Sequence, residues 1–348
     1  MKRILYMMLL AVLPCAAQES GDVFRKYEAD VSRAVNRGFE YLLSVEQKDG
    51  TFPGGHGRST GISSLVGMCF LAQGHTPGIG RYGEAINRRI DYALKFARED
   101  GLLDSSDHGN GPMYAHNITT LFLSEVSGMV DAARQKKIDD VLPKAINILL
   151  RAQAVKKSEQ HQGGWRYHPG SNDSDLSCSG WALMALRSAR LNGAPVPPKA
   201  IDDAVSYIHK NFERKLGHFG YMDEHQHKDS LTGAGLLCLE LCGRHGAEEN
   251  IKAGEWILEN HTQLPRAEFE SYGNYYNAQG MFQLGGKYWK TYANWMYPYY
   301  LEKQEEDGSW KDNRFDKVYG TSMLILAFTV PSRQLPIYQR DERIDEEQ

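Results

Sequence analysis

The sequence contains no long hydrophobic run and no large excess of charge of either sign. Its longest apolar stretch, Ile4–Leu13, is too short to cross a bilayer as a helix. The chain has 40 Lys and Arg residues against 44 Asp and Glu residues, so its formal net charge is −4 and it lacks the basic excess of nucleic-acid-binding proteins. These absences argue against a membrane-spanning protein and against a nucleic-acid partner. The 41% of hydrophobic residues indicates a globular fold.

Cysteine is also scarce. After Cys15 the chain has only Cys69, Cys178, Cys238 and Cys242. Four thiols in a chain of this length do not make a disulfide scaffold, and the repeated C-x-x-C spacing of zinc sites is absent. His225 and His227 lie between acidic residues, in a stretch that we interpret as a solvated loop. We therefore predict no metal and no cofactor, and we interpret the cysteines as small core residues.

The first residues have the pattern of a secretory signal. Lys2 and Arg3 precede the apolar stretch, and Cys15-Ala16-Ala17 offers a cleavage site of small residues. We expect cleavage after Ala17 and export to the periplasm or the extracellular space. A lipid anchor on Cys15 is the alternative, and Pro14 disfavours it because a small residue is expected at that position.

The rest of the chain repeats one unit six times. Each unit has an amphipathic helical stretch, an aromatic or Gly-rich loop, and then an apolar stretch with almost no charge. The apolar stretches begin at Gly61, Asn117, Gly180, Gly233, Ala278 and Gly320. The amphipathic stretches are Val35–Val45, Ile86–Ala97, Leu142–Ala152, Ile201–His209, Ile251–Glu259 and Tyr292–Lys303.

This pattern predicts an all-α fold. The charge-poor helices must be buried all round, whereas the amphipathic helices can bury only one face. Six buried helices surrounded by six half-exposed ones make an (α/α)6 toroid of helical hairpins. We expect the toroid over residues 18–331, after a signal peptide at 1–17. Residues 332–348 should form a C-terminal tail, packed around Leu335–Tyr338 and then disordered.

Three loops carry a Gln-Gly-aromatic signature. Gln304–Trp310 is a full Q-x-x-x-G-x-W, and Gln47–Phe52 and Gln160–Trp165 are shortened variants. With the repeated helix pair, the signature resembles the squalene–hopene cyclase and prenyltransferase β-subunit repeat superfamily, as an exported single-toroid member. The resemblance implies an isoprenoid or other apolar small molecule as the partner. It also implies a structural clasp in which the Gln ends an outer helix and the aromatic ring stacks on it.

The predicted inner helices all run the same way, so their N-termini should share one mouth of the toroid. Residues near these starts are our candidates for binding a substrate, because an apolar concavity with a few polar groups is the usual form of a binding site. They are His116, Trp165, Tyr167, Asp229, Tyr276, Trp310, Asp316 and Tyr319.

Asp173-Ser174-Asp175 resembles a degenerate form of the DxDD motif of class II terpenoid cyclases. The resemblance implies that Asp175 is the general acid and that Asp173 tunes it, since a catalytic acid must be held neutral by burial or by a second carboxylate. The fourth position of the motif is Leu176 rather than Asp. The competing interpretation is that Asp175 caps the following helix.

Three functions stay open at this stage. The first is an exported terpenoid-cyclase-like protein that cyclises, isomerises or only binds a neutral isoprenoid. The second is a non-catalytic binding or scaffold module of the cell envelope, favoured by the absence of a full DxDD motif, a zinc triad and a DDxxD diphosphate motif. The third is a carbohydrate-active toroid in which Asp175 pairs with Asp229 or Asp316 as acid and base.

Overall fold

The structure is a computed structural model that describes residues 15–105, 110–332 and 334–339, with side chains from residue 23 onward. Within these residues the fold is all-α, with a single short hairpin of β1 (Phe212–Glu213) and β2 (His218–Phe219). Most of the predicted signal peptide lies outside the described residues, so export stays a prediction. No helix in the described ranges is long and apolar enough to span a membrane.

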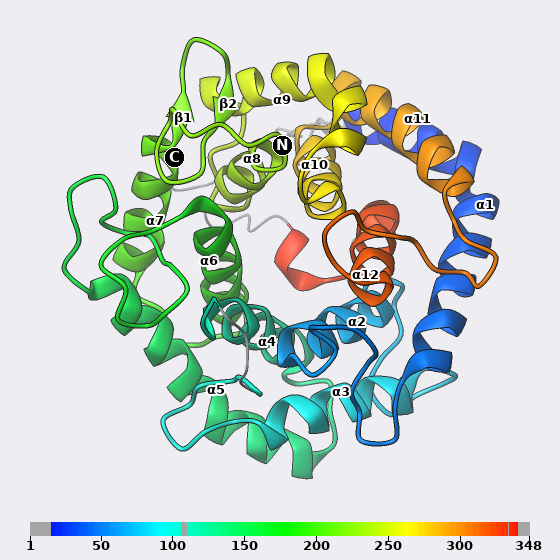
Figure 1. The fold of residues 1–348 in the computed structure, drawn as a ribbon, viewed down its shortest axis with the longest axis vertical. Coiled ribbons are helices and arrows are strands. Elements are labelled where there is room, and N and C mark those ends of the chain that lie inside the picture. Colours follow the sequence, from blue (N-terminus) through cyan, green and yellow to red (C-terminus); the bar gives the residue numbers. More distant parts are fainter. Residues whose placement is uncertain (1–14, 106–109, 333, 340–348) are drawn as a thin grey trace, which may run out of the picture.

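Six helices form a closed inner ring (Figure 1). They are α2 (Thr60–Ala72), α4 (Met113–Val126), α6 (Leu176–Leu191), α8 (Thr232–Leu241), α10 (Glu270–Leu284) and α12 (Lys317–Phe328). Each contacts the next, and α12 contacts α2, so the ring closes on itself. The predicted (α/α)6 toroid is confirmed.

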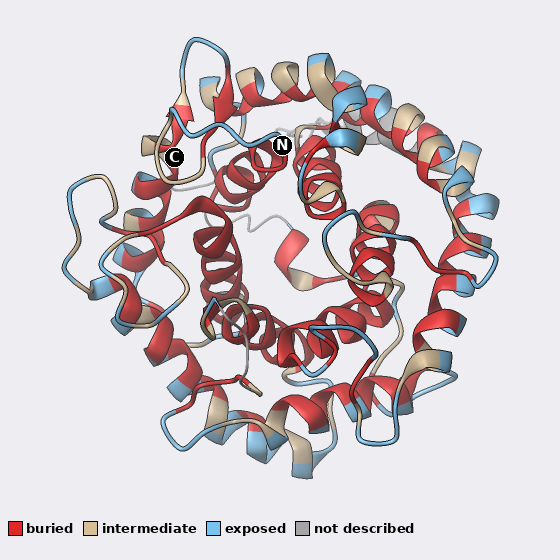
Figure 2. Cartoon of the chain, viewed as in Figure 1, coloured by how far each residue is buried: buried red, intermediate tan, exposed pale blue. Residues whose placement is uncertain are grey.

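Six outer helices surround this ring. They are α1 (Cys15–Val45), α3 (Gly83–Lys95), α5 (Ala132–Ala154), α7 (Pro198–Lys210), α9 (Glu248–Asn260) and α11 (Gly286–Glu302). Each outer helix from α3 onward packs on the inner helix that precedes it in the chain. The first outer helix, α1, packs on α11 and α12. The inner helices are buried along nearly their whole length, whereas the outer helices keep one exposed face (Figure 2). The charge patterns of the two kinds of helix predict this division into buried inner helices and half-exposed outer helices.

The starts of the inner helices differ in how closely they match the expected positions. Ser59 caps α2, with its hydroxyl accepting the Gly61 N–H at 3.2 Å, so this helix begins close to its expected start. In contrast, α10 begins at Glu270, well before the expected Ala278. The intervening residues look like a loop because they are polar and rich in tyrosine, yet nearly all of them are buried in the helix.

Two tryptophans of the signature loops tie loops to outer helices. The indole N–H of Trp310 donates to the Tyr300 carbonyl at 2.7 Å, and that of Trp165 donates to the Leu149 carbonyl at 2.8 Å. Each tryptophan is 1% exposed. The Gln304 amide donates to the carbonyls of Ala34 and Gly308, at 2.8 and 2.9 Å. The last loop is therefore fastened to the first outer helix, α1.

The centre of the ring is occupied by a C-terminal segment. The short helix η3 (Pro336–Tyr338), red in Figure 1, lies between the inner helices and contacts α6. Leu335, Ile337 and Tyr338 are all buried. The four cysteines Cys69, Cys178, Cys238 and Cys242 are free thiols buried in the core.

Candidate functional site

A cavity of about 380 Å³ opens where the inner helices begin. Every inner repeat contributes to its wall, from the first turns of the helix or from the loop before it. One lining residue from each repeat, in chain order, is Ile62, Tyr114, Trp181, Leu231, Tyr272 and Tyr319. The six N-termini therefore gather around a common opening, as the parallel direction of the inner helices predicts.

Aromatic rings form much of the cavity wall. The Phe315 and Tyr319 rings lie 4.5 Å apart between centroids, and the Phe269 ring is 5.8 Å from that of Phe315. On another side the Tyr114 and Tyr167 rings lie 5.8 Å apart. Ring faces and aliphatic side chains favour a flat or hydrocarbon ligand, because both contact it without needing a hydrogen bond.

Phe269 holds an unusual backbone conformation at the rim. It immediately precedes α10 with φ at 66°, in the left-handed region, where a residue with a Cβ pays a steric cost. Such conformations persist where the surrounding structure enforces them, and they concentrate at functional sites. Here the strained conformation accompanies a phenyl ring that lines the cavity.

Of the eight predicted binding residues, Tyr167 and Tyr319 line the cavity. Trp165 and Trp310 do not line the cavity, and each donates its indole N–H to an outer-helix carbonyl. Tyr276 lies deeper in the core, with its ring 5.5 Å from that of Trp181. Asp229 accepts a hydrogen bond from His227 at 2.7 Å, and Asp316 caps α12 by accepting the Tyr319 N–H at 3.0 Å.

His116 is a structural residue of the repeat. The side chain is fully buried, its Nδ1 accepts the Leu103 N–H at 3.1 Å, and its Nε2 lies 3.1 Å from the Ala145 carbonyl. Because a carbonyl can only accept, Nε2 carries the proton. Burial lowers the pKa of His116 to about 4, so the ring is neutral near pH 7.

Asp175 lies behind the cavity wall as the cap of α6. Its side chain is 0% exposed, and Oδ1 accepts from the Cys178 N–H at 2.8 Å and from the Ser177 hydroxyl at 2.6 Å. Burial raises the pKa of Asp175 to about 6. The carboxyl is therefore easier to protonate than an exposed aspartate.

Arg166 pairs with both acids of the Asp173-Ser174-Asp175 stretch. Its Nε lies 3.4 Å from Oδ2 of Asp175, and its Nη1 lies 3.2 Å from Oδ2 of Asp173. A neighbouring cation favours the ionised form of Asp175 and works against the rise caused by burial. The guanidinium also lies over the Tyr167 ring, 4.6 Å from its centroid.

A chain of hydroxyl groups connects Asp175 with the cavity. The Ser177 hydroxyl donates to Asp175 and lies 2.6 Å from the Tyr114 hydroxyl. Both Ser177 and Tyr114 line the cavity, whereas Asp175 does not. A proton from Asp175 can therefore reach a ligand through the Ser177 hydroxyl, either directly or by way of Tyr114.

Several cavity residues were missed by sequence reasoning, among them Trp181, Phe269, Tyr272 and Phe315. The sequence pattern assigns Trp181 to a buried apolar stretch. Such a stretch does not show which of its side chains faces the axis of the ring. Tyr272 was missed because the start of α10 was placed too late. A usable signal existed, since Tyr272 precedes Tyr276 by four residues and so lies on the same face of a helix.

Comparison with solved structures finds chains of the same architecture. The type II terpene cyclase MstE from Scytonema, in complex with merosterolic acid A, matches 88% of this chain and 98% of its own, with a TM-score of 0.56 and 14% identity. A protein from Actinoplanes matches 87% and 99%, with a TM-score of 0.54 and 13% identity. This chain has a terpene-cyclase-like fold. No family profile and no curated protein sequence matches it.

The residues that line the mouth limit the chemistry that it can perform. Among the described lining residues there is no carboxylate, so Asp175, Asp229 and Asp316 do not present a pair of acids to a ligand there. This arrangement disfavours the carbohydrate-active alternative, which needs two carboxyl groups facing one bond. The described residues also contain no group of three or more His, Cys, Asp or Glu side chains arranged to hold a metal ion.

Proposed function

We propose that this chain binds a neutral isoprenoid in the cavity at the mouth of the toroid. The observation that carries the proposal is the aromatic and aliphatic wall built from all six repeats. The MstE structures support it, since one of them holds the substrate geranylgeranyl dihydroxybenzoate at a TM-score of 0.53 to this chain. The signal-like residues 1–17 support the further proposal that the binding takes place outside the cytoplasm.

The size and polarity of the cavity suit a short prenyl alcohol. A volume of about 380 Å³ lies at the lower end of the range of small-ligand pockets, about 300–1,000 Å³, and so suits a short prenyl chain such as that of farnesol. The Tyr114 and Ser177 hydroxyls at the wall can exchange hydrogen bonds with an alcohol.

Filling the cavity tests this proposal. Ile62 lines the cavity near the start of α2, so Ile62→Trp places a larger ring in the space of the ligand. We expect the affinity for farnesol, measured by isothermal titration, to fall at least about tenfold, which is about 1.4 kcal/mol. Ile79→Trp is the matched control, because Ile79 is 70% exposed and lies outside the cavity. No binding by the natural protein, or equal binding by both variants, would contradict the proposal.

Acid-catalysed isomerisation or cyclisation is the second candidate. The specific observation in its favour is the chain from Asp175 through Ser177 to Tyr114, which leads from a buried carboxyl to the cavity. In such a step the Tyr114 proton adds to an alkene carbon, and a proton moves from Asp175 through Ser177 to restore the hydroxyl. The carbocation then loses a different proton, which returns through the Tyr114 and Ser177 hydroxyls to the Asp175 carboxylate, so protons balance.

Deuterium labelling separates catalysis from binding alone. If the acid acts, prenols incubated in D2O gain carbon-bound deuterium in the product, and Asp175→Asn stops this labelling but leaves farnesol affinity within about threefold. Labelling should also decline as pH rises above about 6, because Asp175 is then ionised. Binding without any labelling identifies a non-catalytic binding module.

A further inference from the structure

The lumen of the inner ring is filled by the chain itself. The backbone of segment Leu335–Tyr338, which we call the plug, is bonded near the C-terminal ends of two inner helices, whereas the cavity lies at the first turns of the inner helices. The Ile337 N–H donates to Glu125 at 3.3 Å, and the Gln283 amide donates to the Tyr338 carbonyl at 3.0 Å. Glu125 and Gln283 lie next to the last residues of α4 and α10. The plug therefore occupies the end of the lumen opposite the mouth.

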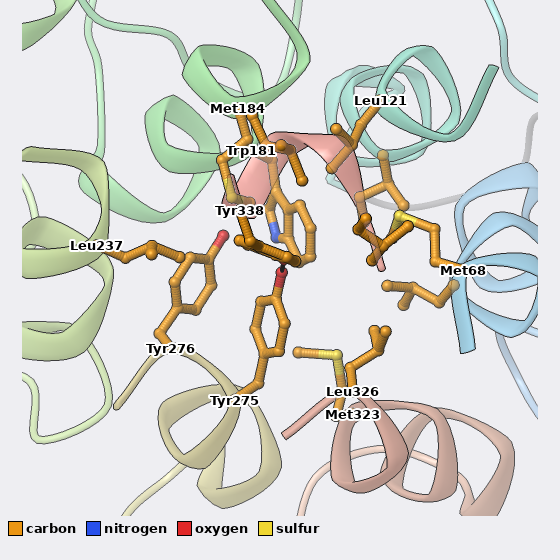
Figure 3. Close-up of a cluster of buried hydrophobic side chains, with 14 of the residues drawn as sticks. Met68, Leu121, Trp181, Met184, Leu237, Tyr275, Tyr276, Met323, Leu326 and Tyr338 are labelled. Atoms are coloured by element: carbon orange, nitrogen blue, oxygen red, sulfur yellow. Dashed lines mark hydrogen bonds between the residues drawn. The ribbon is translucent and has the colours of Figure 1, made fainter. Parts of the chain in front are cut away.

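The wall around the plug is apolar and adaptable. Figure 3 shows the Tyr338 ring among side chains from all six inner helices, and its hydroxyl makes a hydrogen bond with the Tyr275 hydroxyl. Three buried methionines contribute to this wall: Met68, Met184 and Met323. Methionine repacks around ligands of different shape because its side chain is unbranched and flexible. Few polar contacts hold the plug, and the side chains around it can repack when a ligand takes its place.

One layer of rings separates the plug from the cavity. Trp181 lines the cavity, and its ring stacks on Tyr275 at 5.6 Å with an interplanar angle of 9°. Tyr275 in turn makes the hydrogen bond with Tyr338. Trp181, Tyr275 and Tyr338 thus form a continuous column from the cavity to the plug.

The cavity alone is too small for a long linear isoprenoid. Squalene has twice as many carbons as farnesol, and a volume of about 380 Å³ lies at the lower end of the range of ligand pockets, about 300–1,000 Å³. A longer ligand that entered from the mouth would need more of the lumen, and the plug fills that space.

We propose that the plug is displaceable and that the lumen it fills is a second subsite, which accepts the distal part of a long isoprenoid chain. This inference rests on the proposed binding of an isoprenoid at the mouth. Tyr338 is then a residue that determines ligand length, because its ring fills the lumen directly beneath the Trp181–Tyr275 pair. The natural protein therefore prefers short isoprenoids. A long isoprenoid binds in the lumen only if it displaces the plug.

Two substitutions of one residue test the subsite. Tyr338→Ala removes the ring, whereas Tyr338→Phe keeps the ring and removes only the hydroxyl. With farnesol and squalene presented in the same detergent, we expect Tyr338→Ala to raise squalene affinity at least about tenfold and to change farnesol affinity less than about threefold. Tyr338→Phe should keep the chain-length preference of the natural protein. An unchanged preference in a folded Tyr338→Ala protein overturns the inference.

Hydrogen exchange gives a second test, on the natural chain, that does not depend on the stability of a variant. Saturating squalene should speed exchange of the Ile337 amide, which is bonded to Glu125 in the closed lumen. Farnesol should leave that exchange rate unchanged. If squalene binds and Ile337 stays protected, the plug is fixed and the inference fails. If farnesol does not bind at all, the proposed function fails instead.

Discussion

Replacing Trp310 by alanine is expected to lower the free energy of unfolding by about 3–5 kcal/mol, the range for removal of a large buried aromatic side chain. Trp310 is 1% exposed, and its indole N–H donates to the Tyr300 carbonyl at 2.7 Å. The substitution leaves a cavity between the last loop and α11 and removes one of the hydrogen bonds that the Tyr300 carbonyl accepts. Chemical denaturation followed by circular dichroism measures the change.

Trp310→Phe distinguishes the contribution of the buried ring to stability from that of the indole hydrogen bond. Phenylalanine keeps most of the buried surface and loses the N–H, so we expect a loss nearer to about 1–2 kcal/mol. If the natural protein and Trp310→Ala unfold at the same denaturant concentration, Trp310 does not act as a clasp. Farnesol affinity should be unchanged in folded Trp310→Phe, since Trp310 does not line the cavity.

The second large effect concerns Glu125 and pH. Burial raises its pKa to about 7 from an ordinary value of 4.5, so between these values the folded state binds a proton that the unfolded state releases. Its contribution to the free energy of unfolding should therefore fall as pH rises from 4.5 to 7. The total loss is about 3 kcal/mol, complete above pH 7.

The pH dependence due to Glu125 is best measured as the difference in free energy of unfolding between the natural protein and Glu125→Gln. Glu125→Gln keeps a carbonyl oxygen that can accept the Ile337 N–H and removes the buried charge. His116, whose lowered pKa of about 4 acts in the opposite direction below pH 6.5, is present in both proteins and cancels. Denaturant titrations at pH 5 and pH 8 should show Glu125→Gln gaining about 3 kcal/mol relative to the natural chain at the higher pH. If the free energies of unfolding of the two proteins change in parallel between pH 5 and pH 8, Glu125 does not titrate in this range.

The closed ring was predictable because it depends on a coarse property of the sequence. Stretches such as Gly61–Ala72 contain no charged residue, so they have no face that can meet water. The exact limits of the helices depend on finer features. The cap at Ser59 starts α2 close to the expected Gly61, whereas α10 starts at Glu270 without a side-chain cap, among polar residues that the sequence pattern assigns to a loop.

The position of the site was also predictable, but most of its residues were not. Residues before the inner helices or in their first turns do surround the mouth, as Tyr167 and Tyr319 show. Which side chains point inward depends on the rotation of each helix about its axis, and this is decided by packing between repeats. Asp175 illustrates the limit, because the same position suits a cap and a catalytic acid, and only the surrounding contacts show that the carboxyl is walled off behind Ser177.

The fastening of the last loop to the first outer helix has a consequence for how the chain folds. Arg37 donates to the Gln304 side chain at 3.1 Å and to the Glu305 carbonyl at 2.7 Å, contacts that join residues 267 and 268 positions apart. Contacts of such long range form late and slow the search for the native state. The first repeat therefore cannot acquire its final neighbours until translation has reached the sixth. A nascent chain that stalls earlier leaves exposed the faces of α1 and α2 that pack on α11 and α12 in the closed ring.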